Sequence, residues 1–123
     1  MQEFLLILRD HEQRWDNFSP DDFQRIIKNY GDWNAQLAEQ ERFVGAGKLT
    51  SDLGGTVRGD AERGVIVDGP FAEAKEAIAG YYQIRASSLE DAFEVAGNCP
   101  ILEYGGSVEV RAMVMPDEPR ACS

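Results

Sequence analysis

Histidine and cysteine are scarce in this chain of 123 residues, and their scarcity restricts its chemistry. The single histidine is His11, and the two cysteines are Cys99 and Cys122. Two cysteines give at most one disulfide and no ligand spacing for a metal. Because free thiols are the simpler interpretation, we expect a reducing, cytoplasmic location and no bound metal.

Positive charge and long hydrophobic runs are lacking as well. Twelve Lys and Arg stand against 22 Asp and Glu, which gives a net charge of −10. This balance disfavours nucleic acid and anionic membranes, since both attract basic surfaces. The apolar run Phe4–Leu8 is too short for a membrane span or a signal segment. No residue pattern indicates haem, flavin or another cofactor. Nine of the cations are arginines, which favour planar pairing with carboxylates.

Apolar periodicity predicts a mixed fold. We expect strands over residues 4–8, 43–49, 54–58, 64–67, 80–86 and 107–114, and helices over 20–41, 72–78 and 89–97. Setting aside the segment 51–78 leaves strand, helix, strand, strand, helix, strand. This is the ferredoxin-like split βαβ order of an antiparallel α+β sheet. We therefore predict a single domain over 1–115, with 51–78 as an inserted hairpin and loop, and a tail over 116–123.

The two longer helices carry start signals and apolar stripes. Ser19 can cap the first helix, with Pro20 at its first position. Ser87 with Glu90, or Ser88 with Asp91, offers a capping box for the last. The stripes predict these buried residues: Phe23, Ile26, Ile27, Tyr30, Trp33 and Leu37 in the first helix, and Leu89, Ala92, Phe93 and Ala96 in the last.

Strand alternation separates an apolar face from a polar one. The apolar sides of the last two strands must meet the helices, which leaves polar side chains on the opposite side: Tyr81, Gln83, Arg85, Ser107, Glu109 and Arg111. The first strand is apolar on both sides, and an apolar surface is costly to leave in water. A second copy of the sheet would cover it, so we expect a homodimer.

The densest group of titratable residues surrounds one turn. The run reads Asp-Gly-Pro-Phe-Ala-Glu-Ala-Lys-Glu over 68–76, and Gly80-Tyr81-Tyr82 follows. It resembles the signature D-G-P-F-A-E-T-K-E of the DGPF-type, YCII-related proteins, with Ala74 in place of the usual Thr. The resemblance covers nearly the whole length, from Phe4 to Arg111.

This resemblance implies a dimeric α+β barrel, in which two sheets enclose a cavity. It also implies an acid–base enzyme in which a histidine of the first helix pairs with a carboxylate beyond it. Tyr30 stands at that histidine position here, and Glu39 lies near the carboxylate position. Related modules occur alongside extracytoplasmic-function sigma factors, which implies a transcription-linked role through protein contacts.

Three interpretations of the signature stay open. Gly69-Pro70 can simply set a turn that Asp68 stabilises. Alternatively, the corner is catalytic, with a carboxylate as general base and a Tyr or Arg polarising a substrate oxygen; the candidates are Asp68, Glu73, Glu76 and Tyr81. A third interpretation is ligand binding without catalysis, for which the candidates are Arg58, Lys75, Arg85, Glu109 and Arg111.

The sequence thus predicts either a cofactor-independent enzyme for a small polar metabolite or a non-enzymatic binding or regulatory module. An electrostatic expectation accompanies both. At least one of the strand arginines Arg58, Arg85 and Arg111 should contact a carboxylate of the candidate site.

Overall fold

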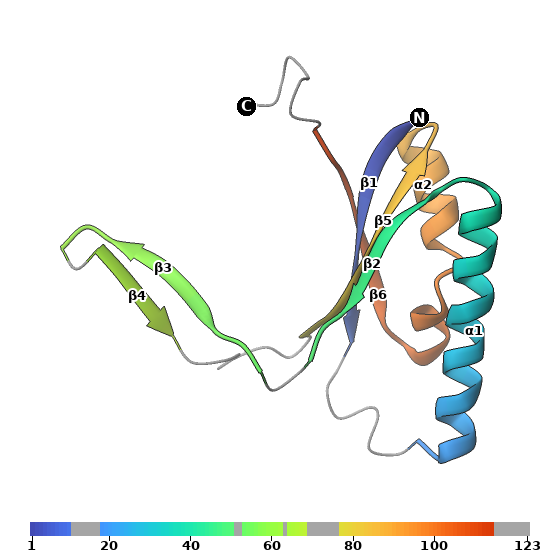
Figure 1. The fold of residues 1–123 in the computed structure, drawn as a ribbon, viewed down its shortest axis with the longest axis horizontal. Coiled ribbons are helices and arrows are strands. Elements are labelled where there is room, and N and C mark those ends of the chain that lie inside the picture. Colours follow the sequence, from blue (N-terminus) through green and yellow to red (C-terminus); the bar gives the residue numbers. More distant parts are fainter. Residues whose placement is uncertain (11–17, 51–52, 63, 69–76, 115–123) are drawn as a thin grey trace.

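The structure, a computed structural model, describes residues 1–10, 18–50, 53–62, 64–68 and 77–114. In chain order, the elements are β1 (Gln2–Asp10), α1 (Pro20–Glu39), β2 (Phe43–Lys48), β3 (Thr56–Asp60), β4 (Gly64–Asp68), β5 (Ala77–Ala86), α2 (Leu89–Ala96), a 3₁₀ helix (Pro100–Tyr104) and β6 (Ser107–Ala112). Four strands form one sheet, and both long helices cover the same face of it (Figure 1).

The four-stranded sheet has the order β2-β5-β1-β6, and all neighbouring strands are antiparallel. With the inserted pair β3–β4 left aside, this is the predicted ferredoxin-like α+β arrangement. The first strand lies in the middle, between β5 and β6. Its central position gives it hydrogen-bonded partners along both edges.

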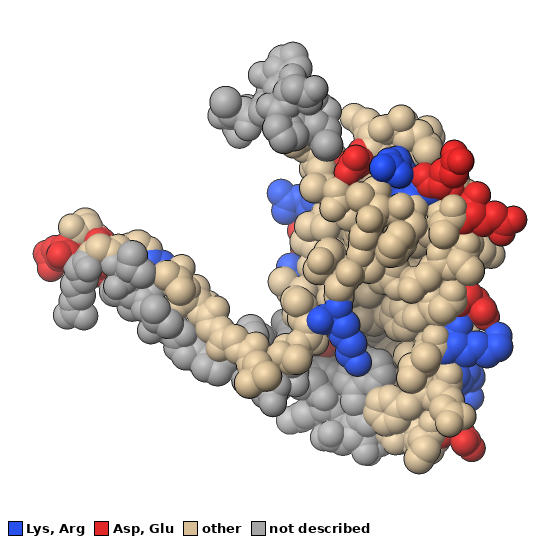
Figure 2. Space-filling view, viewed as in Figure 1, with Lys and Arg blue, Asp and Glu red and all other residues tan. Residues whose placement is uncertain are grey.

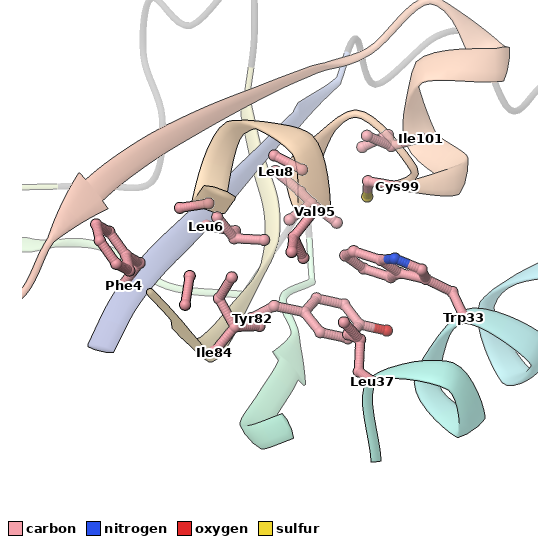
Figure 3. Packing of buried hydrophobic residues seen from close by; sticks show 13 residues of the cluster. Phe4, Leu6, Leu8, Trp33, Leu37, Tyr82, Ile84, Val95, Cys99 and Ile101 are labelled. Atoms are coloured by element: carbon pink, nitrogen blue, oxygen red, sulfur yellow. The ribbon is translucent and has the colours of Figure 1, made fainter. Parts of the chain in front are cut away.

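The core lies between this sheet and the helices. Alternate residues of β1 point into it, and Phe4, Leu6 and Leu8 are buried while Leu5 and Ile7 are half-buried on the other side. The strand β5 alternates in the same way and buries Tyr82 and Ile84. Figure 3 shows these side chains meeting Trp33 and Leu37 of α1, Val95 of α2, and Cys99 and Ile101.

Ser19 and Ser88 cap the two helices as predicted, but the reciprocal capping box forms at α1 and not at α2. The Ser19 hydroxyl accepts a hydrogen bond from the Asp22 backbone N–H, and the Asp22 carboxylate accepts one from the Ser19 N–H. Ser88 caps α2 by accepting from the Asp91 N–H. The Asp91 carboxylate also receives the guanidinium of Arg42, at 2.9 Å and 3.3 Å, which ties the start of β2 to the start of α2.

The predicted buried stripes are partly wrong. Ile26, Trp33 and Leu37 are buried on α1, but Ile27 is 70% exposed and Phe23 is partly exposed. On α2 the buried residues are Ala92, Val95 and Ala96, whereas Leu89 and Phe93 are exposed. Each apolar stripe is wider than the line along which its helix meets the sheet, so the flanking members of the stripe remain in solvent.

The predicted short helix over 72–78 is wrong at its end, and its earlier part lies outside the described residues. Ala77 and Ile78 belong to β5, where they pair with Asp10 and Arg9 of β1 across a register shift. The predicted hairpin is confirmed: β3 and β4 form a separate two-stranded sheet, which we call the arm. Figure 1 shows the arm extending away from the four-stranded sheet, on the side opposite the helices.

Candidate functional site

The face of the four-stranded sheet opposite the helices carries the predicted polar residues. We call it the open face, and its members are Glu3, Leu5, Ile7 and Arg9 of β1, Tyr81, Gln83 and Arg85 of β5, and Ser107, Glu109 and Arg111 of β6. In the strand register, Ile7 stands between Tyr81 and Glu109, and Leu5 stands between Gln83 and Arg111. Directly opposed residues of antiparallel strands lie on the same face. Two half-buried aliphatic side chains are therefore flanked by polar groups.

Glu109 is held by two arginines at this face. One Arg9 Nη donates to Glu109 Oε1 at 3.1 Å, and one Arg111 Nη donates to Oε2 at 3.1 Å. The hydrogen bonds from Arg111 and then from Arg9 lower the pKa of Glu109 below its ordinary value. Glu109 is thus negatively charged near neutral pH, and both guanidinium groups hold its carboxylate in place. The expected contact between a strand arginine and a site carboxylate is met by Arg111.

Tyr81 lies across the backbone of β2. Its partner in the register is Gly47, and a Cβ added at Gly47 would lie 2.6 Å from the Tyr81 ring. Real Cβ atoms do not approach a ring that closely, so the lack of a Cβ at Gly47 leaves room for the Tyr81 ring. The Tyr81 residue remains 38% exposed and presents its ring to the open face.

The far end of the open face is also polar. The Gln83 side-chain amide donates to Glu3 Oε1 at 2.6 Å. Arg85 lies two residues further along β5 on the same face, and its backbone is anchored by two bonds with Arg42. The predicted residues Tyr81, Arg85, Glu109 and Arg111 therefore share one surface.

Two other predicted site residues lie on the arm instead of the open face. Arg58 lies on β3 and Asp68 ends β4, where it pairs with Thr56, so both belong to the arm. Glu73, Lys75 and Glu76 lie outside the described residues, as does His11. In a single chain, Arg58 and the backbone of Asp68 therefore lie on the arm, apart from Tyr81 and Glu109 on the open face.

A second polar cluster lies on the helix side of the sheet. The Tyr82 hydroxyl donates to Asn34 Oδ1 at 2.5 Å, and the Tyr82 ring stacks on Tyr30 with centroids 6.4 Å apart. Tyr30, which stands where the resemblance implies a histidine, packs against the hydrophobic core. Cys99 is a buried free thiol next to the Tyr30 hydroxyl. Asp10, at the end of β1, is also buried.

Burial keeps the hydroxyls and the thiol of this cluster uncharged. Removal from water raises the pKa of Tyr82 to about 12 and that of Cys99 to about 11, and it raises the pKa of Tyr30 as well. A thiolate or phenolate is needed for nucleophilic attack. These groups therefore act as neutral packing and hydrogen-bonding partners near neutral pH.

Glu39 lies away from both clusters. It lines a solvent-open groove of about 430 Å³ between α1 and the segment that follows α2, together with Asp32, Gln36, Trp33 and Pro100. Glu39 and Tyr30 thus do not form the dyad that the resemblance implies for a histidine and a carboxylate. In the described part of the chain, no three His, Cys, Asp or Glu side chains gather as a metal-binding group.

Comparison with known proteins identifies the family. The family model of the YCII-related domain matches residues 3–115. An uncharacterized protein of Rhizobium meliloti (strain 1021) is 30% identical over 106 residues, which cover 80% of this chain and 81% of that protein. The chain therefore belongs to the YCII-related family. Among the described residues, no helix is both long and apolar enough to cross a membrane.

Sequence reasoning missed two contributors to the open face, Arg9 and Gly47. Arg9 reaches Glu109, which is 100 residues away in the sequence, and only the pairing of β1 with β6 brings them together. Gly47 is unremarkable until β2 is placed beside Tyr81. The alternation of β1 could have placed Arg9 on the open face, since it follows Leu5 and Ile7 at a spacing of two.

Proposed function

We propose that this YCII-related protein is a homodimer whose two sheets enclose a cavity for a small polar metabolite. Leu5 and Ile7 support this assembly, because both are half-buried in the single chain and lie at the centre of a sheet face. Packing against a second sheet would remove their remaining apolar surface from water. The likeness to dimeric α+β barrels predicts the same arrangement.

The arrangement of Glu109 between Arg9 and Arg111 carries the proposal for a ligand. Arg111 keeps 69% of its side chain exposed while it holds Glu109, so its guanidinium can also meet a ligand carboxylate or phosphate. Glu109 can accept a hydrogen bond from a ligand hydroxyl or amine. The neighbouring Tyr81 ring offers a flat surface for the rest of the molecule.

Binding suits this face better than proton abstraction by Glu109 does. Its two arginine partners lower the pKa of Glu109, and a general base works best with a pKa near the working pH. Cofactor-free acid–base chemistry would instead require Asp68, Glu73, Glu76 or Tyr81, which we retain as the catalytic candidates. The proposed function is therefore metabolite binding in the cavity between the sheets, with any turnover assigned to those four residues.

A matched pair of glycine variants tests the site. In Gly47→Ala, the new Cβ would lie 2.6 Å from the Tyr81 ring and must displace it, whereas a Cβ at Gly45 meets nothing within 4 Å. A thermal-shift screen of small carboxylates and phosphates supplies the ligand. At a concentration one hundred times its dissociation constant, a ligand stabilises the protein by about 2.7 kcal/mol.

We expect Gly47→Ala to lose most of this stabilisation and Gly45→Ala to keep it. An undiminished ligand response in Gly47→Ala would show that the Tyr81 surface is not the binding site. A monomer without any metabolite response would favour the alternative, a regulatory module that acts through protein contacts.

A further inference from the structure

The arm presents apolar side chains to water. Val57 on β3 is 65% exposed, and Leu53 before it is 74% exposed. By sequence alone, β4 contains three consecutive apolar residues, Val65, Ile66 and Val67. A two-stranded hairpin on its own is marginally stable in water, and consecutive apolar residues are typical of strands covered on both faces. The arm therefore requires a covering surface.

Within the described part of one chain, the arm stands apart from the other elements. In the described residues, β3 and β4 pair with each other and form a sheet separate from the larger one. Figure 1 shows the arm projecting on the side of the open face, yet pointing away from it. The described part of the chain thus offers two incompletely covered surfaces, the arm and the open face, on the same side of the molecule.

Charge opposes the approach of a second copy less at the open face than over the rest of the chain. The whole chain carries a net charge of −10, so two copies repel each other over most orientations. On the open face, however, three arginines (Arg9, Arg85 and Arg111) stand against Glu3 and Glu109. Figure 2 shows basic side chains on the edge of the molecule from which the arm projects. Two copies can approach here without the repulsion found elsewhere.

We infer that the two copies exchange arms, so that β3–β4 of one copy borders the cavity between the two sheets and packs against the open face of the other. This inference rests on the homodimer proposed above and adds a composite site to it. A two-fold axis makes the exchange reciprocal. It would bring Arg58 and Asp68 of one copy to the Tyr81–Glu109 surface of the other. Arg58 and Asp68, which belong to the arm in a single chain, would then meet Tyr81 and Glu109 of the partner copy.

A pair of charge variants tests the arm. Val57→Asp places a carboxylate on the arm, and Ile27→Asp places one at a similarly exposed position on α1. We expect Val57→Asp to raise the dimer dissociation constant at least about tenfold, as a desolvated charge at an interface does. Ile27→Asp should leave the constant unchanged. Equal dissociation constants for Val57→Asp and the unmodified protein would overturn arm exchange.

A photo-crosslink keeps the test decisive where Val57→Asp fails to fold. The full chain carries p-benzoylphenylalanine at position 57 and is mixed with ¹⁵N-labelled unmodified chain. Arm exchange predicts a crosslink from the labelled chain's β1, β5 or β6 peptides to position 57 of the unlabelled chain. A dimer by light scattering that gives no such mixed crosslink overturns the exchange while the proposed homodimer stands. A monomer by light scattering overturns both.

Discussion

The buried cluster of Tyr30, Tyr82 and Cys99 on the helix side of the sheet should make the protein less stable at alkaline pH. Burial raises the pKa of Cys99 from its ordinary 9.0 to about 11, and that of Tyr82 from 10.0 to about 12. The folded state therefore keeps protons that the unfolded chain releases. Stability is fully present below pH 9 and falls as the pH rises above the ordinary values of the two groups.

The magnitude follows from the same values. Between pH 7.5 and pH 10.5, the linkage relation gives a loss of about 2 kcal/mol from Cys99 and about 1 kcal/mol from Tyr82. Tyr30 changes the free energy in the same direction, because burial raises its pKa too. The measurement is urea unfolding at the two pH values, which yields the free energy of unfolding at each.

Two variants separate this cluster from all other titrations. Cys99→Ala should reduce the alkaline loss by about 2 kcal/mol, even though it lowers stability at pH 7.5 by removing a buried sulfur. Tyr81→Phe, on the open face, serves as the control and should leave the loss unchanged. An alkaline loss in Cys99→Ala equal to that of the unmodified protein would refute the argument that a neutral thiol is buried there.

Two further predictions concern the first turn of α2 and the strand β2. The hydrogen bonds from Arg42 and from the Ser87 backbone and hydroxyl lower the pKa of Asp91 to about 2. The stability that this carboxylate confers is therefore present above its ordinary pKa of 3.8 and is lost as the pH falls through about 2. Asp91→Asn should lower the melting temperature at pH 7 and flatten the decrease of the melting temperature below pH 4, and a variant with the pH profile of the unmodified protein would contradict this. Gly47→Ala should change the free energy of unfolding by no more than about 1 kcal/mol, because the displaced Tyr81 ring is exposed and alanine loses less backbone entropy on folding than glycine does. Urea unfolding of this variant, with Gly45→Ala as the control, measures the change. A loss well above this amount would show that Tyr81 has a structural role.

The fold could be predicted because local signals and periodicity agree along the body of the chain. Ser19 and Pro20 mark the start of α1, and the structure has the capping box there. The alternation of β5 placed Tyr82 and Ile84 towards the helices and Tyr81 towards the open face. Such patterns depend on residues near one another in sequence, so they predict local structure without knowledge of the tertiary structure.

The parts that failed depend on packing or on distant partners. Ile27 and Phe93 are apolar and lie within their helical stripes, but only the line of contact with the sheet decides which members are buried. Ala77 and Ile78 end a run of residues that favours a helix, yet pairing with β1 makes them part of β5. Tertiary context overrides local preference in such cases.

The candidate site divides in the same way. Alternation grouped Tyr81, Arg85, Glu109 and Arg111 correctly on one face. The signature run, which drew attention to Asp68, gave no information on how far the arm carries Arg58 and Asp68 from that face. That separation is a property of the hairpin's direction, which no local pattern encodes.

The homodimer through the open face is the central claim, and the mass in solution tests it most directly. Light scattering of the unmodified protein at micromolar concentration should give about twice the 13.7 kDa chain mass. Ile7→Asp, on the open face, should give a folded chain of single mass, whereas Ile27→Asp on α1 should remain a dimer. A single-chain mass for the unmodified protein, or a full dimer in Ile7→Asp, would contradict the account.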